Sequence, residues 1–531
     1  MEYFAIDQLF PEWCVFEQFV HFDVFRAFAL DGLKSSHPVE VPVNSASEID
    51  EVFDAISYSK GSCCVRMLLN WLGAENFRQG MVQYLKKFSF SNAVTNDLWN
   101  TLGEHLNKDV SSMMKSWTSC TGYPVVVVTE SAQGDNKTLH LTQHRFLDGG
   151  VDMSDPTIWS VPISYLICHP DNTVTEQQLL MTEKQSSVII PSNIKWIKFN
   201  KNQTGFFRVN YQGDSYYSSL VDPIKNKQLT AIDRMTIIED ATTLSKSGLV
   251  PIEHVLELFS AYTNEDNYTV LSSVATCLST VFNLIKCESE QVLEQFSSLA
   301  RSIFVKHRDD LGWEQQSNES HLRSMKRSLV MANLFKFNDK ATIEKALSKF
   351  ADFQKDPSSL IPDLREVVYS AVAKYGNSDM FQQVWNIYQT SDLNEEKMRV
   401  LKGIGLTQND ELLYQTVARV LDGSVLTQDI SYLLIGLSQN PKATKILWTY
   451  FFNNYAAIRQ KFESGLLFGR VIKLFTESAI EPSDVQEIKE QLELIKTKSI
   501  QRTVDQVKET ITLNSEWSTK VKGNIIAWLS K

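Results

Sequence analysis

The sequence predicts a mainly α-helical protein that carries one β-sandwich region, and three observations lead to this fold class. First, the chain has only 21 glycines and 14 prolines in 531 residues, which favours long uninterrupted helices. Second, apolar residues recur at helical spacing in residues 1–120 and again from about residue 222 to the end. Third, short β-branched and aromatic runs replace that spacing between residues 123 and 211.

The first region predicts helices that are interrupted by one extended segment. Residues 36–43 hold two prolines and alternating valines, which are typical of an extended loop or a short edge strand. Ser47 followed by Asp50 is typical of a helix start, and we expect that helix to continue to Gly61. Two further helices are expected over residues 76–88 and 95–106.

The middle region predicts a β-sandwich. Its short runs are separated by turn residues such as Asp135-Asn136 and Gly149-Gly150. The predicted strands cover residues 124–128, 138–146, 159–168, 188–190, 196–199 and 205–211. So many short strands in so few residues favour an antiparallel sandwich over a parallel sheet.

The third region predicts an α-solenoid. An apolar stripe with three-residue steps runs from Leu229 to Leu244, and Gly248 and Pro251 then suit a helix end and the start of the next helix. Similar helix pairs follow, and a single core rarely grows past about 300 residues, so paired helices in a solenoid are favoured over one compact all-α bundle. The predicted domains are therefore residues 1–120, 121–212 and 213–531.

The charge and the start of the chain bear on its partners and its compartment. The chain has 52 basic and 63 acidic residues, a net charge of −11, so we expect no binding to nucleic acid. No stretch approaches the ~20 consecutive apolar residues that a membrane span needs, and we expect no membrane partner. The first Lys or Arg is Arg26, whereas a signal peptide begins with basic residues. A cytoplasmic location is the expectation.

Spacing alone identifies no reaction. The pattern at His140 and His144 has the two-histidine spacing of a zinc protease, but Leu141 stands where the glutamate base would be. The segment also alternates as a strand, which would place the two imidazoles about 13 Å apart, too far to share one ion. The acidic pairs Glu239-Asp240 and Glu395-Glu396 are interpreted as solvated helix surfaces.

An ordered series of segments resembles a known family. It includes SHP at residues 36–38, FDAISYSKG at 53–61, FRQGM at 77–81, GYP at 122–124, GFFRVNY at 205–211 and PDLR at 362–365. Together they resemble the later part of the M1 family of zinc aminopeptidases, and in particular the puromycin-sensitive aminopeptidases. The resemblance covers essentially the whole chain. It implies the tail of a thermolysin-like catalytic domain, a β-sandwich, and a large ERAP-like C-terminal helical domain.

The resemblance implies one catalytic residue and one absence. Tyr58 matches the family tyrosine whose phenol donates a hydrogen bond to the oxyanion of the tetrahedral intermediate; without the family it would be read as a partly buried helix tyrosine. The family's HExxH, its glutamate ligand and its Gly-Ala-Met-Glu-Asn motif do not occur in this sequence. The match implies that the chain starts about half a dozen residues after the last ligand. We expect that it binds no cofactor by itself, zinc belonging to the full-length family, and that it is inactive alone.

A non-catalytic function is the alternative. The sandwich and the solenoid could serve as a module that binds peptides or a protein partner, since solenoids present broad concave surfaces. By resemblance the ligands would be peptides, and the partner would be the missing N-terminal half or another protein. We also expect a sticky surface on the first helices, at Tyr3, Phe4, Phe16 and Phe19.

Overall fold

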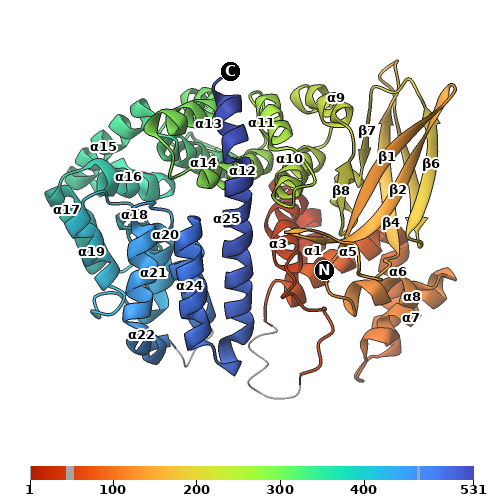
Figure 1. Ribbon diagram of the computed structural model, residues 1–531, viewed down its shortest axis with the longest axis horizontal. Coiled ribbons are helices and arrows are strands. Elements are labelled where there is room, and N and C mark those ends of the chain that lie inside the picture. Colours follow the sequence, from red (N-terminus) through yellow and green to blue (C-terminus); the bar gives the residue numbers. More distant parts are fainter. Residues whose placement is uncertain (1, 44–52, 463–466) are drawn as a thin grey trace. The chain divides into compact units, whose positions relative to one another are not determined.

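The computed structural model describes residues 2–43, 53–462 and 467–531. The chain forms two compact units (Figure 1). The first unit contains residues 1–262 and 269–274, and the second contains residues 263–268 and 275–531. The protein is mainly helical with a small β region, which confirms the predicted fold class. The bounds of the three predicted domains stay a prediction.

The first unit begins with short helices. They are α1 (Glu2–Leu9), the 3-10 turn η1 (Pro11–Trp13), α2 (Val15–Phe19), the π-helix η2 (Val20–Val24), α3 (Phe25–Asp31), the π-helix η4 (Ile56–Lys60), α5 (Gly61–Leu72), α6 (Ala74–Lys87), α7 (Thr95–Leu106) and α8 (Val110–Thr118). The helices predicted over residues 76–88 and 95–106 are therefore confirmed as α6 and α7. The predicted start of a helix at Ser47 lies outside the described residues.

Helix α5 is the core of this helical part because its apolar residues recur on one side. Cys64, Met67, Leu68 and Leu72 are all buried, which is the spacing of an amphipathic helix. The helix ends at Gly73, whose φ of 86° suits glycine and stops the helical pattern. The N-terminal part of α5 continues directly from the π-helix η4, so residues 56–72 form one helical run.

Two sheets form the sandwich. One has β3 (Gly150–Asp152), β2 (Asn136–Leu147), β1 (Pro124–Gln133) and β8 (Arg208–Tyr211) in that order, and β6 (Gln185–Pro191) also pairs with β2. The other has the order β5 (Val174–Met181), β4 (Val161–Cys168), β7 (Trp196–Phe199). All pairings are antiparallel except β1 with β8. The sheets meet where the Tyr211 hydroxyl of β8 accepts the Phe199 N–H of β7 at 2.8 Å.

Strands β3 and β5 were not predicted from the sequence. β5 pairs with β4 only, and nearly all of its residues are exposed. An exposed edge strand has no buried face to impose an apolar alternation, so the pattern that revealed β1, β2 and β4 is missing. β3 is only 3 residues long.

Four helices follow the sandwich, and they tie it to the rest of the first unit. They are α9 (Asp214–Lys225), α10 (Ala231–Lys246), α11 (Ile252–Ala261) and α12 (Tyr268–Leu284), the last contributing Thr269–Val274 to this unit. Arg208 of β8 donates to Asp240 of α10 at 2.6 Å and to the Tyr123 hydroxyl at 3.2 Å. Its guanidinium also lies 4.5 Å from the centre of the Phe28 ring of α3. One buried arginine thus joins three parts of the unit.

The second unit is built from helices stacked in pairs. They are α13 (Glu290–Leu311), α14 (His321–Lys336), α15 (Lys340–Lys355), α16 (Pro362–Tyr375), α17 (Ser378–Thr390), α18 (Asn394–Ile404), α19 (Asp410–Ala418), α20 (Ile430–Ser438), α21 (Ala443–Asn453), α22 (Tyr455–Phe462), α23 (Phe468–Thr476), α24 (Pro482–Ile495) and α25 (Gln501–Leu529). Helices α14, α16, α18, α20, α23 and α25 pack on one another in succession. This arrangement confirms the predicted solenoid.

The solenoid closes on itself. The last helix, α25, packs against α13, and the Ser518 hydroxyl donates to the Leu284 carbonyl at 2.7 Å (Figure 1). One continuous apolar core runs through this unit, from Met331 to Ile511. Every helix from α14 to α25 therefore contributes apolar residues to a single core.

Three of the four residues in the two acidic pairs lie against arginines and not on the solvated surfaces that the sequence suggested. Glu239 and Asp240 both lie against the buried Arg208, and burial raises the pKa of Asp240 even though Arg208 lowers it. Glu396 is buried between Arg365 and Arg399, while its neighbour Glu395 is exposed. Helical spacing places charges on a face, but only the fold decides whether an arginine covers that face.

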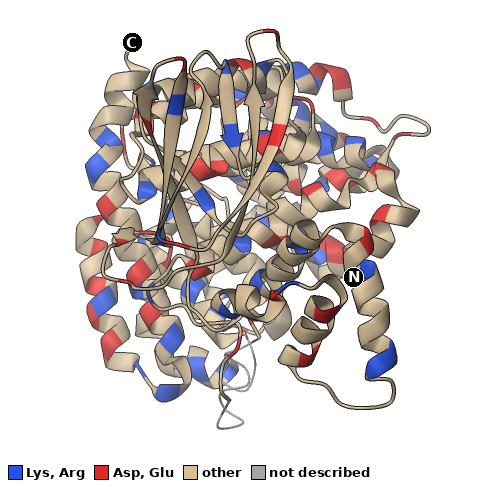
Figure 2. Cartoon of the chain, turned by 90° about the vertical axis from the view of Figure 1, so that its right-hand side faces the viewer, with Lys and Arg blue, Asp and Glu red and all other residues tan. Residues whose placement is uncertain are grey.

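The surface of the first helices also differs from the prediction. Phe19 is buried, and Tyr3, Phe4 and Phe16 are half-buried because their rings pack on one another. The exposed apolar side chains are instead Leu9, Phe10, Trp13 and Phe22. Figure 2 shows Lys and Arg interspersed with Asp and Glu along the elements. Among the described residues, none of the helices is both long enough and apolar enough to span a membrane.

Candidate active site

Tyr58 lies in a wide helical turn directly before α5. The turn is the π-helix η4, in which the Lys60 N–H donates to the Ala55 carbonyl at 2.9 Å, a step of five residues. The Tyr58 side chain is 63% exposed, and its ring centre lies 6.1 Å from that of Phe53. Such wide turns recur at functional sites. Tyr58 is thus presented on the surface of the first unit rather than partly buried.

A buried ion pair anchors the C-terminal end of this turn. The Lys60 ammonium lies 2.8 Å from the Asp31 carboxylate of α3, and neither side chain is exposed. Lys60 also donates to the carbonyls of Gly122 at 3.0 Å and Cys120 at 3.3 Å. Asp31 accepts the Gly122 N–H at 3.0 Å and the Ser36 hydroxyl at 2.9 Å. A buried pair that is hydrogen-bonded on both sides fixes the position of both elements.

The residue between Tyr58 and Lys60 is held as well. The Ser59 hydroxyl donates to Asp23 of the π-helix η2 at 3.0 Å. The other carboxylate oxygen of Asp23 accepts the Tyr3 hydroxyl of α1 at 2.8 Å. Burial and the hydrogen bond to Asp23 raise the pKa of Tyr3, so its phenol stays protonated and remains a donor. The turn therefore has contacts to α1, η2 and α3.

A histidine and an aspartate meet at the N-terminal end of the turn. The Nε2 atom of His37 lies 2.8 Å from one Asp54 carboxylate oxygen. The other oxygen of Asp54 accepts the N–H groups of Ile56 at 2.8 Å and Ser57 at 3.2 Å. Burial raises the pKa of Asp54, but the hydrogen bond and charge of His37 and the two amides together lower it below its usual value. Asp54 is thus an anionic cap of the helix that carries Tyr58.

His21, in the π-helix η2, has a different environment from His37. Its two ring nitrogens each lie 2.8 Å from a hydroxyl, those of Ser272 and Ser273 at the start of α12. Burial lowers the pKa of His21 to about 4, so the ring is neutral near pH 7. His21 is a packing residue that joins η2 to α12.

The two-histidine pattern at His140 and His144 forms no metal site. Both residues lie on strand β2, where a separation of four residues is about 13 Å. The His140 Nε2 atom is instead 2.9 Å from the Ser131 hydroxyl of β1. Among the described residues, no group of three or more His, Cys, Asp or Glu side chains is arranged to hold a metal ion. The described residues therefore do not fit the zinc that the M1 family uses.

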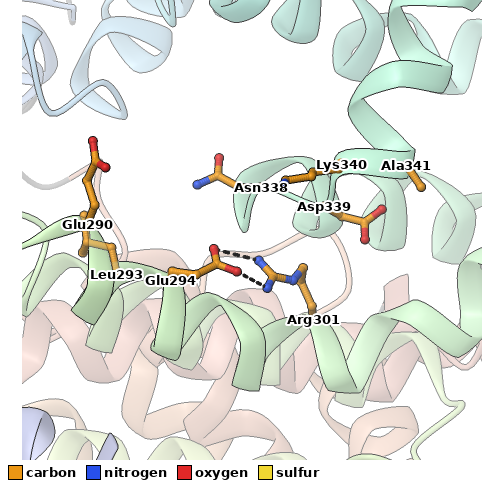
Figure 3. A pocket seen from close by; sticks show the side chains of 8 residues that line it. All are labelled: Glu290, Leu293, Glu294, Arg301, Asn338, Asp339, Lys340 and Ala341. Atoms are coloured by element: carbon orange, nitrogen blue, oxygen red, sulfur yellow. Dashed lines mark hydrogen bonds and ion pairs between the residues drawn. The ribbon is translucent and has the colours of Figure 1, made fainter. Parts of the chain in front are cut away.

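The second unit has a cavity of about 700 Å³ near the starts of α13 and α15 (Figure 3). The charged groups that line it are largely committed to one another. Arg301 donates to both carboxylate oxygens of Glu294, at 2.5 and 3.3 Å, and to the Phe337 carbonyl at 2.7 Å. Asp339 caps α15 through the Thr342 N–H at 2.9 Å and binds Arg308 at 2.7 Å. The cavity presents no nucleophile beside a base.

The sequence placed Tyr58 at this site but missed the groups around it. His37 and Asp54 lie 17 residues apart, and Lys60 contacts carbonyls about sixty residues downstream. His37, Asp54 and Lys60 all fall within segments that carry the resemblance, but no spacing in the sequence indicates that they pair.

Two family models match the chain. The model described as "Peptidase family M1 domain" matches residues 1–117, which include Tyr58 and its surroundings. The model described as "ERAP1-like C-terminal domain" matches residues 196–513, more than half of the chain.

Curated relatives cover this chain almost completely. The alanine/arginine aminopeptidase of Saccharomyces cerevisiae is 32% identical over 535 residues, which is 100% of this chain and 61% of the relative. Aminopeptidase M1 of Arabidopsis thaliana is 32% identical over 98% of this chain and 60% of its own length. The puromycin-sensitive aminopeptidase of Caenorhabditis elegans is 30% identical over 90% of this chain and 51% of its own length.

The chain therefore spans only about half to three fifths of the length of these relatives. The segments that resemble the M1 family, the two matched models and the relatives agree with one another. Together with the fold, they assign the chain to the M1 family of aminopeptidases, as a member that carries part of the peptidase domain and the ERAP1-like C-terminal domain.

Proposed function

We propose that this chain is part of a zinc metalloaminopeptidase that removes N-terminal residues from peptides, and that Tyr58 stabilises the transition state. The single observation that carries this proposal is the presentation of Tyr58. Its phenol is exposed, while the residues on either side of it are fixed by buried polar contacts. The relatives that match the chain are named aminopeptidases, which supports the same reaction class.

The chemistry required of Tyr58 is the donation of a hydrogen bond. When water attacks a peptide carbonyl, negative charge develops on the carbonyl oxygen, and a neutral donor that is already in place stabilises it. A phenol suits this task because it stays protonated at neutral pH. Loss of one such donor typically costs about 3–4 kcal/mol, which corresponds to a kcat lower by about 100- to 1,000-fold.

We further propose that the 531-residue chain is inactive by itself. The sequence contains no HExxH pattern, and the described residues offer no set of ligands for a catalytic zinc ion. A tyrosine donor without a generated nucleophile does not reach useful rates, so the zinc site must come from other residues. In this proposal the chain supplies the oxyanion donor and the helical domain, and the ligands lie outside its sequence.

The test uses two proteins. The purified chain is assayed for bound zinc and for hydrolysis of aminoacyl-naphthylamides, and we expect neither. A chimera then joins the chain to the part of the Saccharomyces cerevisiae aminopeptidase that lies outside the match, and we expect it to be active. Stoichiometric zinc together with hydrolysis by the chain alone would contradict the proposed inactivity.

The role of Tyr58 is tested in the chimera. We expect Tyr58→Phe to lower kcat by about 100- to 1,000-fold with little change in KM, because it removes one donor to the transition state. Tyr414 is a matched control, since it is also an exposed helix tyrosine, 61% exposed, in α19 of the second unit. Tyr414→Phe should leave kcat unchanged. Equal activity of the two variants would overturn the assignment of Tyr58.

The alternative is a non-catalytic module that binds peptides or a partner. The observation that favours it is the lack of a ligand set for zinc among the described residues. Peptide binding by the chain alone at micromolar concentration, combined with an inactive chimera, would support this alternative over the enzyme.

A further inference from the structure

The contacts of His37 show which of its two ring nitrogens carry a proton. His37 is buried, with 6% exposure. Its Nδ1 atom lies 2.8 Å from the Pro38 carbonyl, which can only accept, so Nδ1 must carry a proton. Its Nε2 atom lies 2.8 Å from an Asp54 carboxylate oxygen. A neutral imidazole with Nδ1 protonated would present a lone pair at Nε2 to that oxygen, which is repulsive.

A second proton must therefore lie between His37 and Asp54. Although burial acts to raise the pKa of Asp54, the hydrogen bond and charge of His37 and the two amide N–H groups lower it overall. The carboxylate is thus the charged partner, and the proton belongs to the ring. His37 is a doubly protonated imidazolium that donates at both nitrogens, and the contact is a charge-assisted hydrogen bond.

The same carboxylate holds the start of the turn that carries Tyr58. Its second oxygen accepts the N–H groups of Ile56 and Ser57, two of the groups that a helix start leaves without a backbone partner. The downstream end is held separately by Ser59 and Lys60. Tyr58 lies between these two anchors, so its position depends on both.

We propose that His37 and Asp54 are positioning residues for Tyr58, and that their hold on the turn is released when His37 loses its second ring proton. The importance of this contact for catalysis rests on the proposed function, whereas the contact itself is independent of that function. After deprotonation, the Nε2 lone pair faces a carboxylate oxygen, so Asp54 must move or lose its contact. The cap on Ile56 and Ser57 would then weaken.

Other charged groups around the turn are committed elsewhere. Asp23 of η2 accepts from Tyr3 and Ser59, and Asp31 of α3 is paired with Lys60. The groups that lower the pKa of Asp54 include His37 and the two amide N–H groups, while burial acts to raise it. Deprotonation of His37 is therefore the change to which the contact with Asp54 would respond.

The test measures amide hydrogen exchange in the whole 531-residue chain, expressed as protection factors so that the intrinsic pH dependence is removed. We compare about pH 6 with about pH 9, on either side of the range in which an imidazole changes charge. We expect the protection of Ile56 and Ser57 to fall by about tenfold between the two, because a hydrogen bond to a charged group is lost. An internal control is the cap of α7, where Asp97 accepts the Val94 N–H at 2.9 Å without a histidine.

Asp54→Asn distinguishes this proposal from a merely structural contact. The side-chain amide that this substitution introduces can donate to a neutral His37 Nε2, while its oxygen still accepts the two N–H groups. We therefore expect the order to reverse: at about pH 9 the variant should protect Ile56 and Ser57 at least as well as the unchanged chain, and at about pH 6 it should protect them less. His37→Gln, which cannot titrate, should remove the pH dependence.

Protection that does not change with pH in the unchanged chain, or the same pH dependence in Asp54→Asn, would overturn the proposal. The pH dependence of kcat in the active chimera tests whether this contact matters for catalysis. We expect Asp54→Asn to keep kcat high at more alkaline pH, with KM unchanged. If Tyr58→Phe has no effect on kcat, the proposed function fails, while the exchange measurements still decide whether the pair holds the turn.

Discussion

Each of the two units is stabilised internally by a different kind of contact. In the first unit, single buried charges join elements of different types: Lys60 meets Asp31, and Arg208 meets Asp240 and two aromatic rings. In the second unit, one apolar core continues from Met331 to Ile511 through successive helix pairs. Buried ion pairs occur there too, as at Arg327 and Glu319, but they are additions to a continuous core.

This difference teaches where precise geometry comes from. Apolar packing is tolerant, because several side chains of similar volume can fill one space. A buried charge has few acceptable partners, and each partner must lie at a hydrogen-bonding distance. The first unit has apolar packing as well, but the elements around Tyr58 are joined by the less tolerant kind of contact. We therefore expect single polar changes to affect the first unit more than the second.

The largest effect is expected for the ion pair of Lys60. Lys60→Met leaves the Asp31 carboxylate buried without its cation, and we expect the free energy of unfolding of the first unit to fall by about 3–5 kcal/mol. Urea unfolding followed through hydrogen exchange of α5 measures it. The double variant Lys60→Met, Asp31→Leu should recover much of the loss. Lys442→Met removes an exposed ion pair in the second unit and is the control; an equal loss there would break the comparison.

An acid-induced loss of stability is expected in the first unit because of His21. The pKa of His21 is about 4 in the folded chain because of burial, whereas an unfolded histidine titrates near 6.5. Between these values the unfolded chain binds more protons, so stability falls as the pH falls from about 6.5 to about 4, by at most about 3 kcal/mol. The melting temperature across this range checks it. His21→Asn should weaken this dependence, and an unchanged slope in that variant would contradict the assignment.

The second unit should respond at the opposite end of the pH range. Burial lowers the pKa of Lys336 in α14 to about 8 from its ordinary value of 10.5. The folded chain releases this proton first, so the stability of this unit should rise as the pH increases from about 8 to about 10.5. At neutral pH we expect Lys336→Met to stabilise the unit by about 1–2 kcal/mol, as measured by urea unfolding. Lys445→Met, an exposed control, should have no such effect at either pH.

The smallest effect is expected for alanine substitutions at two helical glycines of the first unit, Gly61 of α5 and Gly80 of α6. A methyl group added at Gly61 would meet nothing within 4 Å, and the φ of Gly61 is an ordinary −55°. We expect Gly61→Ala to stabilise the first unit by about 0.5–1 kcal/mol, measured by urea unfolding, because alanine favours the helix. At Gly80 of α6 the same methyl would lie 2.6 Å from the Leu102 Cδ2 atom, so Gly80→Ala should destabilise it. A lower free energy of unfolding in Gly61→Ala would contradict this expectation.

The sequence predicted the elements better than it predicted the contacts between them. The periodicity over residues 95–106 gave α7 with its bounds, and the valine run gave the start of β1. Strand β5 was missed because an exposed edge has no apolar alternation. At the site, Tyr58 was found through a family resemblance, whereas no pattern in the sequence indicated the partners of Asp54 and Lys60. Burial of a charge depends on partners far along the chain, and a local pattern contains no information about them.

The wide turn before α5 also has a consequence for insertions and deletions. A π-turn contains one residue more than the α-helical turn it replaces, and each residue of an α-helix turns the chain by about 100°. The extra residue therefore changes the direction in which Asp54 points relative to the side chains of α5. Asp54 can contact His37 while the apolar side of α5 packs in the core. Removing a single residue between Asp54 and Tyr58 would restore a regular helix and turn Asp54 away from His37, while α5 kept its packing. Length, and not only residue type, is constrained at this point of the chain.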